Sequence, residues 1–553
     1  MRKKIVAMVL AGAMAAASLA GCGSSTETAA TETASTESAS TEAVTSEAAT
    51  DTTAEAAFTD YSAGFPDRVT IQIPVYDRAF EGWNVTDNYY TQWIQENFGE
   101  KYNVDVEYVA IGRSTEVADT MQLLAAGNAP TILFHYDMPQ AVNYYGEEAF
   151  QAVNLEEMAY YAPDYYAKMA DTISTYGELD GETMFFFAER NAIYYNWVTL
   201  IRQDWLDAVN MEMPTNLEEL NAVAAAWKEA GLGTLGGNLI TKSFTYDYAF
   251  RGASVDDTEL GLYSDLNVAP LTWGSSEAYL KNLNYQYNNG LIDPEFYLKA
   301  EDSDVKAAFV AGQTGTYAFY ISSATDVISS LLANDPDAKV ATLNGFAGAP
   351  ADSHPYYYEY PPYGMIMGMN GDATDEERAA LYMFLNWMQE PANLFFLQHG
   401  VEGETYTLDA DGIAVPVADY TGESKLSNNN NKDYWCLVAE VADYGEEELN
   451  YKANLVNLAP EGYEYLVEDS YNYAKETAQY GLINKIFTKV VESSSENAAD
   501  LNALWQELYV DLATCPEDEF DAKYAEACEE YLGAGYQAIL DEKQSLMDEG
   551  AYK

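Results

Sequence analysis

The first folded stretch of the chain combines two hydrophobic periods. Apolar side chains occupy every second position in residues 69–75 and 104–108, and every fourth position in residues 90–98 between them. A period of two is typical of a strand with one buried face, and a period near 3.6 is typical of a helix. The pattern predicts a strand, helix, strand unit, with buried positions Val69, Ile71, Ile73, Val75, Tyr90, Ile94, Phe98, Val104, Val106 and Tyr108.

A further helix and strand follow directly. Val117, Met121 and Leu124 lie on one helical face that ends at Gly127, and residues 131–135 form a short apolar run. Strands that alternate with helices favour a parallel α/β architecture, in which ligands bind beyond the carboxyl ends of the strands. The candidate cleft residues are therefore those just after the first and third strands, unless they only cap the turns that follow. They are Tyr76, Asp77 and Asp137.

Two capping boxes predict later helices. Thr215 precedes Glu218 by three residues, and Thr374 precedes Glu377 by the same spacing, which is the pattern of a helix N-terminus. The buried faces are expected to comprise Leu217, Leu220, Ala224 and Trp227 in the first helix and Leu381, Phe384, Leu385 and Met388 in the second. Trp387 lies off the second face, where it either makes another packing contact or is partly exposed. The last stretch of about 80 residues has a helical, acidic pattern.

The N-terminus has the pattern of a secretion signal. Three basic residues precede an apolar run that is too short to span a membrane comfortably, and Leu-Ala-Gly-Cys ends at Cys22. This ending resembles the bacterial lipobox, which implies cleavage after residue 21 and lipidation of the Cys22 sulfur; the alternative is an ordinary signal peptide with a chance cysteine. Residues 22–57 contain almost only Ser, Thr, Glu and Ala beyond the cysteine, a composition that predicts a disordered tether.

Charge and cysteine content narrow the function classes. The formal net charge is −62, which argues against nucleic acid or an anionic membrane surface as a partner, although solubility alone also explains it. Three cysteines follow Cys22, an odd number that excludes a full disulfide framework. A Cys515–Cys528 bridge stays open.

Signals for catalysis are weak. His135, His354 and His399 are far apart in sequence and have no zinc-binding spacing. The glycines at 231, 233 and 236 follow a helix, where a dinucleotide site requires a preceding strand. Residues 409–412 contain two aspartates and a glycine but lack the later ligands of a calcium loop, so a hairpin turn is the better interpretation. We expect no catalytic centre, no resident metal and no cofactor, while a bound calcium ion is not excluded.

Aromatic residues are abundant, with 46 Tyr, 20 Phe and 9 Trp. Aromatic faces pack against the C–H surfaces of sugar rings, and polar side chains bind the sugar hydroxyls. Most of these rings must nevertheless belong to the core. Trp83, Trp273 and Trp435 are the best candidates for ligand stacking because their neighbours are polar and typical of loops.

Four segments in order resemble the extracellular solute-binding proteins of family 1, in particular the long Gram-positive lipoproteins of oligosaccharide uptake. They are Leu124-Ala-Ala-Gly-Asn-Ala-Pro130, Leu200-Ile-Arg-Gln-Asp-Trp-Leu206, Asn289-Gly-Leu-Ile-Asp-Pro-Glu-Phe296 and His399-Gly-Val-Glu-Gly-Glu-Thr-Tyr406. The resemblance implies a periplasmic-binding-protein-like fold of type II, with two α/β lobes joined by a hinge, a ligand cleft between them, and no catalytic centre.

Carried onto this chain, the resemblance places the crossings between lobes near residues 187–196, near 341–349 and after Glu390. The first lobe would comprise residues 58–190 and 343–395, and the second 191–342 and 396–553. Arg202 and Asp204 match the family pattern Arg-x-Asp-Trp-Leu, either as a buried ion pair or as a ligand contact. Glu402 and Tyr406 match another family pattern near the hinge or cleft.

The sequence and the resemblance together predict a lipid-anchored, monomeric protein on the outer face of the cell membrane. It would bind a small molecule, most simply a neutral oligosaccharide because Lys and Arg are scarce, and deliver it to the permease of an ATP-driven importer. Peptide or other nutrient binding, glycan hydrolysis at the surface, and reporting to a membrane sensor are the alternatives. The predicted ligand-binding residues are Tyr76, Asp77, Trp83, Asp137, Arg190, Trp273, Tyr320, Tyr363 and Trp435.

Overall fold

A computed structural model describes residues 58–553 apart from short gaps. The gaps are residues 79–81, 114, 147–148, 191–196, 237–256, 264–267, 300–301, 345–348, 352–356, 360, 418–419, 427–430, 478–480 and 484–485. The signal, Cys22, the tether and His354 therefore lie outside the described residues.

The predicted strand, helix, strand unit is confirmed. Strands β1 (Val69–Asp77) and β2 (Val104–Gly112) pair in parallel, with Val69 opposite Val104. Helix α1 (Tyr89–Ile94) connects them and continues through a π-helical turn at Gln95–Gly99. Tyr90, Ile94 and Phe98 are fully buried, as a helical face turned toward the core requires.

The strand pairs of the next sheet are all antiparallel, so the prediction of a parallel sheet is correct only for β1 and β2 in this region. Strand β12 (Tyr363–Asn370) runs antiparallel to β3 (Ile132–His135), β4 (Phe150–Gln151) and β7 (Phe185–Glu189). Strand β3 lies beside β1, where the Thr131 N–H donates to the Gln72 carbonyl at 3.0 Å. Because β12 is antiparallel to β3 and β7, β12 begins at the edge where those two strands end. We call this edge of the sheet, where β3 and β7 end and β12 begins, the carboxyl edge.

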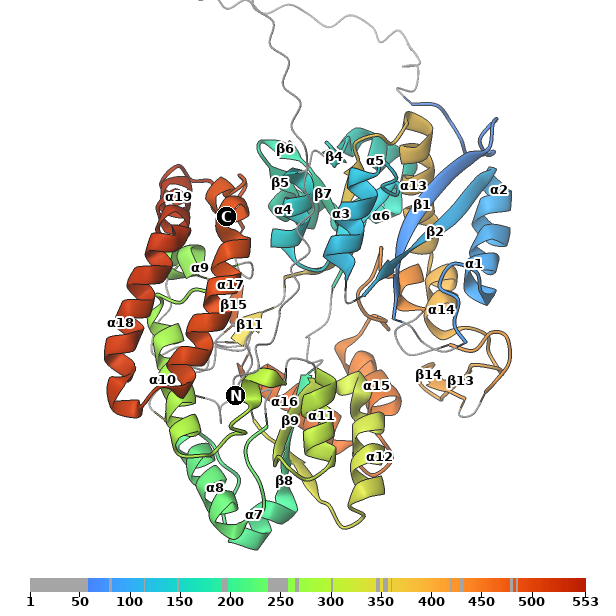
Figure 1. Ribbon diagram of the computed structural model, residues 1–553. Helices are drawn as coiled ribbons and strands as arrows, with labels where there is room; N and C mark the ends of the chain where they lie inside the picture. The colour runs from blue at the N-terminus through green and yellow to red at the C-terminus, as the bar shows by residue number, and fades with distance from the viewer. Residues whose placement is uncertain are drawn as a thin grey trace, which may run out of the picture. The chain divides into compact units, whose positions relative to one another are not determined.

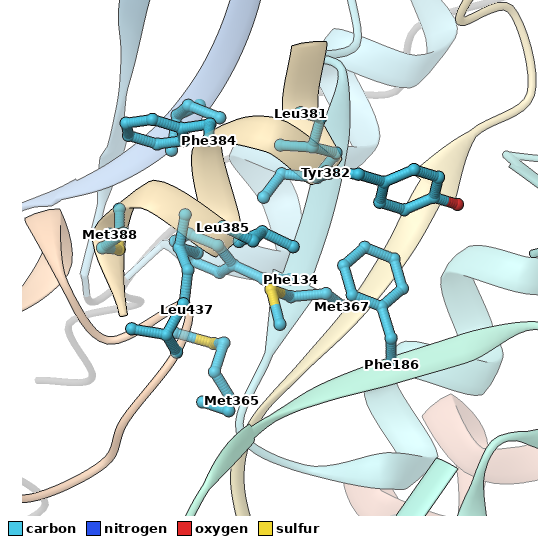
Figure 2. Packing of buried hydrophobic residues seen from close by; sticks show 14 of the residues in the cluster. Phe134, Phe186, Met365, Met367, Leu381, Tyr382, Phe384, Leu385, Met388 and Leu437 are labelled. Carbon is cyan, nitrogen blue, oxygen red and sulfur yellow. The ribbon is translucent and has the colours of Figure 1, made fainter. Parts of the chain in front are cut away.

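One hydrophobic cluster fills the space around these strands. It includes β1, β3, β7, β12 and helix α13 (Asp375–Met388), which begins at the predicted capping box of Thr374 and Glu377. Figure 2 shows Phe384, Leu385 and Met388 of α13 with Met365 and Met367 of β12 in this packing. Trp387 is also buried, so it makes a second packing contact.

A second sheet has its own core. Strand β8 (Trp197–Arg202) pairs antiparallel with β9 (Thr316–Tyr320) and β10 (Val340–Thr342). Helices α12 (Ala324–Asn334) and α16 (Tyr465–Thr477) supply buried apolar residues to the same cluster. Figure 1 shows β8 and β9 beside α16 and α11 (Asp302–Val310).

Helices build the third core, which includes the predicted helical C-terminus. Its elements are α8 (Leu217–Ala230), α10 (Gly274–Asn288), α17 (Glu492–Thr514), α18 (Phe520–Tyr531) and α19 (Gln537–Asp548). The first predicted capping box is wrong by one residue, since the α8 N-cap is Asn216 and Thr215 instead binds the Glu219 carboxylate at 2.9 Å. The asparagine amide oxygen accepts the Glu219 N–H at 2.9 Å, which satisfies one of the free N–H groups of the first turn.

The remaining helices and strands connect these parts. They are α2 (Glu100–Tyr102), α3 (Glu116–Ala125), α4 (Met138–Gly146), α5 (Leu155–Tyr161), α6 (Pro163–Tyr176), β5 (Glu178–Leu179), β6 (Glu182–Thr183), α7 (Gln203–Val209), α9 (Asp257–Tyr263), β11 (Tyr357–Glu359), α14 (Pro391–His399), β13 (Tyr406–Leu408), β14 (Ala414–Pro416), α15 (Glu447–Leu458) and β15 (Gly481–Ile483).

The packing moves the predicted boundaries between lobes. Leu397 and residues 434–439 belong to the first cluster, whereas the predicted division assigns residues 396–553 to the second lobe. Leu343 packs in the third core although residues 343–395 were assigned to the first lobe. The Leu343 N–H donates to the Thr199 carbonyl at 2.8 Å, so residue 343 itself is still bound to the second sheet.

Several smaller predictions have clear outcomes. Asp409 and Gly412 form the turn of the β13–β14 hairpin, where the Asp409 carboxylate accepts the Ile413 N–H at 2.9 Å. Cys515 and Cys528 are both free thiols, so they form no bridge in this structure. Within the described ranges we find no helix of the length and hydrophobicity that crossing a membrane requires.

Candidate functional site

Residues 432–440, which we call the edge segment, run along the carboxyl edge. The Tyr76 N–H near the end of β1 donates to the Asp433 carboxylate at 3.2 Å. At the end of β7, the Glu189 N–H donates to the Val438 carbonyl at 3.1 Å and the Glu189 carbonyl accepts the Glu440 N–H at 2.7 Å. One segment thus contacts the ends of strands that are far apart in sequence.

Apolar side chains anchor the edge segment to the core. Leu437 is fully buried and reaches into the packing around Met365 and Leu385 (Figure 2). The Tyr434 hydroxyl donates to the Val85 carbonyl at 2.8 Å and accepts from the Asn88 side chain at 2.6 Å. These contacts anchor the segment that carries Lys432, Asp433 and Glu440.

Asp433 forms the best satisfied ion pair of the segment. Arg78 donates to both carboxylate oxygens, at 2.5 Å and 3.1 Å, and the Tyr76 N–H is a third donor. Burial raises the pKa of Asp433, while the hydrogen bonds and charge of Arg78 act in the opposite direction. Burial also opposes the charge on Arg78, but the contact with Asp433 outweighs it and raises the pKa of the guanidinium.

Glu440 forms a second ion pair at the other end of the segment. Its Oε1 accepts from the Lys432 ammonium at 2.8 Å. Its Oε2 is buried, and no donor among the described residues reaches it. Gly364 lies so close that a Cβ built there would be 2.4 Å from this oxygen. Burial first, and then the charge of Glu440, raise the pKa of the neighbouring Tyr136 hydroxyl.

The ring of Tyr76 joins the edge segment to the ends of β2 and β3. The guanidinium carbons of Arg78 and Arg113 lie 5.4 Å and 4.9 Å from its centroid, within the range of cation–π attraction. Arg113 also forms an ion pair with Glu116 at the start of α3. Burial acts to raise the pKa of Glu116, but its contacts, His135 foremost, lower it overall.

His135 is held in one orientation. Its Nδ1 accepts the Asp137 N–H at 2.9 Å, and its Nε2 lies 3.3 Å from Glu116 Oε1. Because Nδ1 is an acceptor, the proton of the neutral ring lies on Nε2 and points to the carboxylate. The role of His135 here is to orient Glu116, as expected for a structural histidine.

Seven of the nine predicted ligand-binding residues lie in this part of the molecule. Tyr76 and Asp77 end β1, Asp137 follows β3, Arg190 follows β7, and Tyr363 begins β12. Trp435 belongs to the edge segment, and the Trp83 ring lies 6.4 Å from that of Tyr434. The rule that ligands bind beyond strand ends therefore found residues that the fold brings together.

The other two predicted residues, Trp273 and Tyr320, lie elsewhere. Trp273 precedes α10, is buried and stacks on Tyr263 with centroids 5.5 Å apart. Tyr320 ends β9 and is 53% exposed. Trp273 and Trp435 were expected in polar, loop-like surroundings, but only 5% and 8% of their surfaces are exposed. That expectation is wrong for both rings, because neighbouring side chains cover most of their surface.

Sequence reasoning missed the charged partners in this site. Arg78 and Arg113 directly follow β1 and β2, so the strand-end rule could have identified both. Lys432, Asp433 and Glu440 carried no such signal, because they follow no strand. The partners of Asp433, Tyr76 and Arg78, are 357 and 355 residues away in the sequence.

The two family motifs near the predicted hinges have structural roles. Arg202 pairs with Asp204 at 2.5 Å and with Asp335 at 2.7 Å, so Arg202 and Asp204 form the buried ion pair that was one of the two expectations. Tyr406 begins the β13–β14 hairpin and lies near His399, with ring centroids 6.1 Å apart. The backbone of Glu402 forms an isolated β-bridge with that of Tyr406.

The carboxyl edge is close to electrically neutral. Four of its cations each pair with one acid, and the pairs are Arg78–Asp433, Arg113–Glu116, Lys168–Glu189 and Lys432–Glu440. Arg190 donates to the carbonyls of Pro361 and Pro362. No group of three His, Cys, Asp or Glu side chains suited to a metal occurs in the described part of the chain.

A surface pocket of about 390 Å³ lies among the helices of the third core and not at the carboxyl edge. Its lining residues come from α10, α18 and the turn between α17 and α18, and include Lys281, Tyr285 and Phe520. It contains none of the predicted ligand-binding residues, and it lacks the converging strand ends that mark the carboxyl edge.

Comparisons with known proteins agree with this fold. The chain is 24% identical over 308 residues to the polygalacturonan/rhamnogalacturonan-binding protein YtcQ of Bacillus subtilis (strain 168), covering 52% of this chain and 58% of the relative. The chain thus spans little more than half the length of this relative.

Solved structures match over most of the chain. The alginate-binding protein AlgQ2 without calcium ion matches with a TM-score of 0.61 and 16% identity, over 89% of this chain and 100% of that one. The S. pneumoniae ABC-transporter substrate binding protein FusA, as an EF-hand mutant with fructo-nystose, matches with a TM-score of 0.59 and 13% identity, over 87% and 99%. These similarities show that the fold is periplasmic-binding-protein-like, as the sequence resemblance implied.

The family follows from the match to a family model. The model described as bacterial extracellular solute-binding protein matches residues 93–394, which is more than half of the chain. The matched range includes β2, β3, β7 and β12, whose ends form the carboxyl edge. The chain therefore belongs to the bacterial extracellular solute-binding protein family.

Proposed function

We propose that this protein captures neutral oligosaccharides outside the cell and delivers them to the permease of an ATP-driven importer. The observation that carries the proposal is the carboxyl edge, where aromatic rings and four ion pairs without excess charge converge. Paired charges and ring faces suit a ligand rich in hydroxyl groups, because they bind hydroxyls without requiring a ligand charge.

The relatives support a glycan ligand and differ in its charge. YtcQ is named for polygalacturonan and rhamnogalacturonan, AlgQ2 for alginate, and FusA was solved with fructo-nystose. The overall charge of −62 disfavours an acidic glycan here. We therefore place this chain with the neutral binders.

Capture requires no catalysis. A ligand that contacts both lobes stabilises the closed arrangement, and only this difference in affinity shifts the equilibrium between open and closed forms. In this proposal the protein is a monomer without enzymatic activity. Tyr76, Asp77, Trp83, Asp137, Arg190, Tyr363 and Trp435 contribute at the carboxyl edge, and Trp273 and Tyr320 contribute from the rest of the chain.

The proposed location is the outer face of the cell membrane, with the chain attached through lipid on Cys22. The small residues before Cys22 support this anchor, and residues 24–57 supply a polar tether. Cys22→Ala should release the full chain from the membrane fraction. An unchanged distribution would reject the lipid anchor and leave the binding function untouched.

Thermal unfolding with candidate ligands tests the function. Residues Phe58–Lys553 form one compact unit, so this fragment can be screened against neutral oligosaccharides, oligouronates, amino acids and short peptides. A ligand at about a hundred times its Kd stabilises the folded state by about 2.7 kcal/mol. We expect a rise in Tm with one class of neutral glycan and no product after long incubation.

The other outcomes separate the alternatives. A shift with peptides only would replace the substrate class and keep the binding function. Shortened glycans after incubation would indicate a hydrolase, which requires two carboxylates about 5 to 10 Å apart facing the substrate.

A further inference from the structure

Glu440 and Asp433 lie in the same segment and are both buried, yet only Asp433 is fully satisfied. Asp433 accepts three hydrogen bonds, from Arg78 twice and from the Tyr76 N–H. Glu440 accepts one, from Lys432 on Oε1, while no donor in the described ranges reaches Oε2. A buried carboxylate oxygen without a donor is unfavourable, so this arrangement calls for an explanation.

The position of Glu440 is built into the fold. The backbone N–H of Glu440 binds the Glu189 carbonyl at 2.7 Å, and Ala439 forms a parallel bridge with Glu189. Gly364 at the start of β12 leaves room for the carboxylate, since any Cβ there would collide with it. A glycine, a strand end and a lysine thus hold the unpartnered oxygen at the carboxyl edge.

The charges around Glu440 are balanced by pairs. Lys432 neutralises Glu440, and Arg78 neutralises Asp433, which is the residue after Lys432 in the sequence. Tyr136 and Cys436 are two further titratable groups near Glu440, and burial first, with the charge of Glu440, raises the pKa of both, so both stay neutral. Removing the charge of Glu440 alone would therefore leave Lys432 as an uncompensated cation at this edge.

We propose that Glu440, together with Lys432, makes the carboxyl edge select uncharged, hydroxyl-bearing sugar rings over rings that carry a carboxylate. A ligand hydroxyl donates to the free oxygen of Glu440. A uronate carboxylate has no proton to donate at neutral pH and is repelled by the same oxygen. The inference rests on the proposed function and names the substrate class of that site.

The test is a change of preference in Glu440→Gln, which keeps the shape of the side chain and removes its charge. Affinities of the fragment 58–553 are measured by calorimetry for a panel of neutral fructo-, gluco- and galacto-oligosaccharides and for oligogalacturonates of matched length. We expect neutral binding to weaken about tenfold and uronate binding to strengthen about tenfold, the effect of about 1.4 kcal/mol in each direction. Glu461→Gln, at an exposed position between α15 and α16, is the matched control and should change neither.

Lys432→Gln provides a second variant if Glu440→Gln does not fold. It removes the opposite charge and should move the preference further toward neutral glycans. Equal losses for both glycan classes in either variant would show a structural role and overturn the assignment. Preferential uronate binding by the unmodified protein would overturn the assignment and the neutral substrate class but not glycan capture. Binding of neither panel would overturn the assignment together with the proposed function.

Discussion

The ion pairs of the two sheet regions are arranged in opposite ways. At the carboxyl edge the acids are buried, with 0% of the Asp433 side chain and 4% of Glu440 exposed, while Arg78 and Lys432 are 17% and 23% exposed. After β8 the cation is buried, with 3% of Arg202 exposed, and its partners Asp204 and Asp335 are 26% and 43% exposed. In these pairs the cation is the more exposed partner at the carboxyl edge, and the acid is the more exposed partner after β8.

This difference separates the proposed recognition surface from a structural contact. Arg202 pairs with two acids, and water can solvate both of them. The three side chains satisfy one another and connect β8 to the turn after α12. The buried acids of the carboxyl edge have no such access to water, and they depend on a single cation each. Breaking a pair should therefore have unequal consequences in the two regions.

The largest expected effect is on Asp433. Asp433→Ala leaves Arg78 partly buried without a countercharge and the Tyr76 N–H without an acceptor, which should lower the free energy of unfolding by about 3 to 5 kcal/mol. Asp335→Ala is the matched variant, and it should cost less than about 1 kcal/mol because Asp204 remains and Asp335 is exposed. Denaturant titration of both variants measures the difference, and equal losses would contradict the comparison.

A smaller effect should come from His399, which ends the helix α14 that packs under the edge segment. Asn431, the residue before that segment, donates to the Leu397 carbonyl of this helix at 2.9 Å. Burial lowers the pKa of His399 from 6.5 to about 4. Burial is the cause of this shift, because it disfavours the charged form of the ring.

The pH dependence follows from this lowered pKa. The unfolded chain binds the proton below pH 6.5, and the folded chain binds it only near pH 4. The contribution of the neutral ring is therefore complete above pH 6.5 and is lost as the pH falls toward 4, by up to about 3 kcal/mol. The free energy of unfolding, measured between pH 4 and 8, should change less with pH for His399→Gln than for the unmodified protein. The same pH dependence in both proteins would show that the ring is solvated.

The smallest effect should come from Gly364, which distinguishes the two acids of the edge segment. Gly364→Ala places a Cβ against the Glu440 carboxylate, and the strain should lower the free energy of unfolding by about 1 to 3 kcal/mol. Gly274→Ala is the control, because nothing lies within 4 Å of its Cβ position. Equal Tm values for the two variants would show that the Glu440 side chain can move away from a Cβ at position 364. The strain predicted here would then be absent.

Sequence reasoning reached the strand ends of the site and stopped there. Tyr76, Asp77, Asp137 and Arg190 follow strands that their hydrophobic periods or the family resemblance revealed, and the sheet brings them together. Trp273 was misjudged because polar neighbours in sequence do not report what packs on a ring in space. The alternation of short strands likewise did not reveal that β12 runs antiparallel to β3 and β7.

The sequence by itself determined the secretion signal pattern, the strand, helix, strand unit, the helical C-terminus and the family resemblance, because periodicity, caps and local motifs are encoded within a few residues of one another. Only the tertiary structure decided which charges meet. Asp433 and Arg78 are 355 residues apart, and the hydrogen bonds of the edge segment reach β1 and β7, two strands far apart in the sequence. Pairing at such separations follows from how apolar faces pack into one core, which no local pattern records.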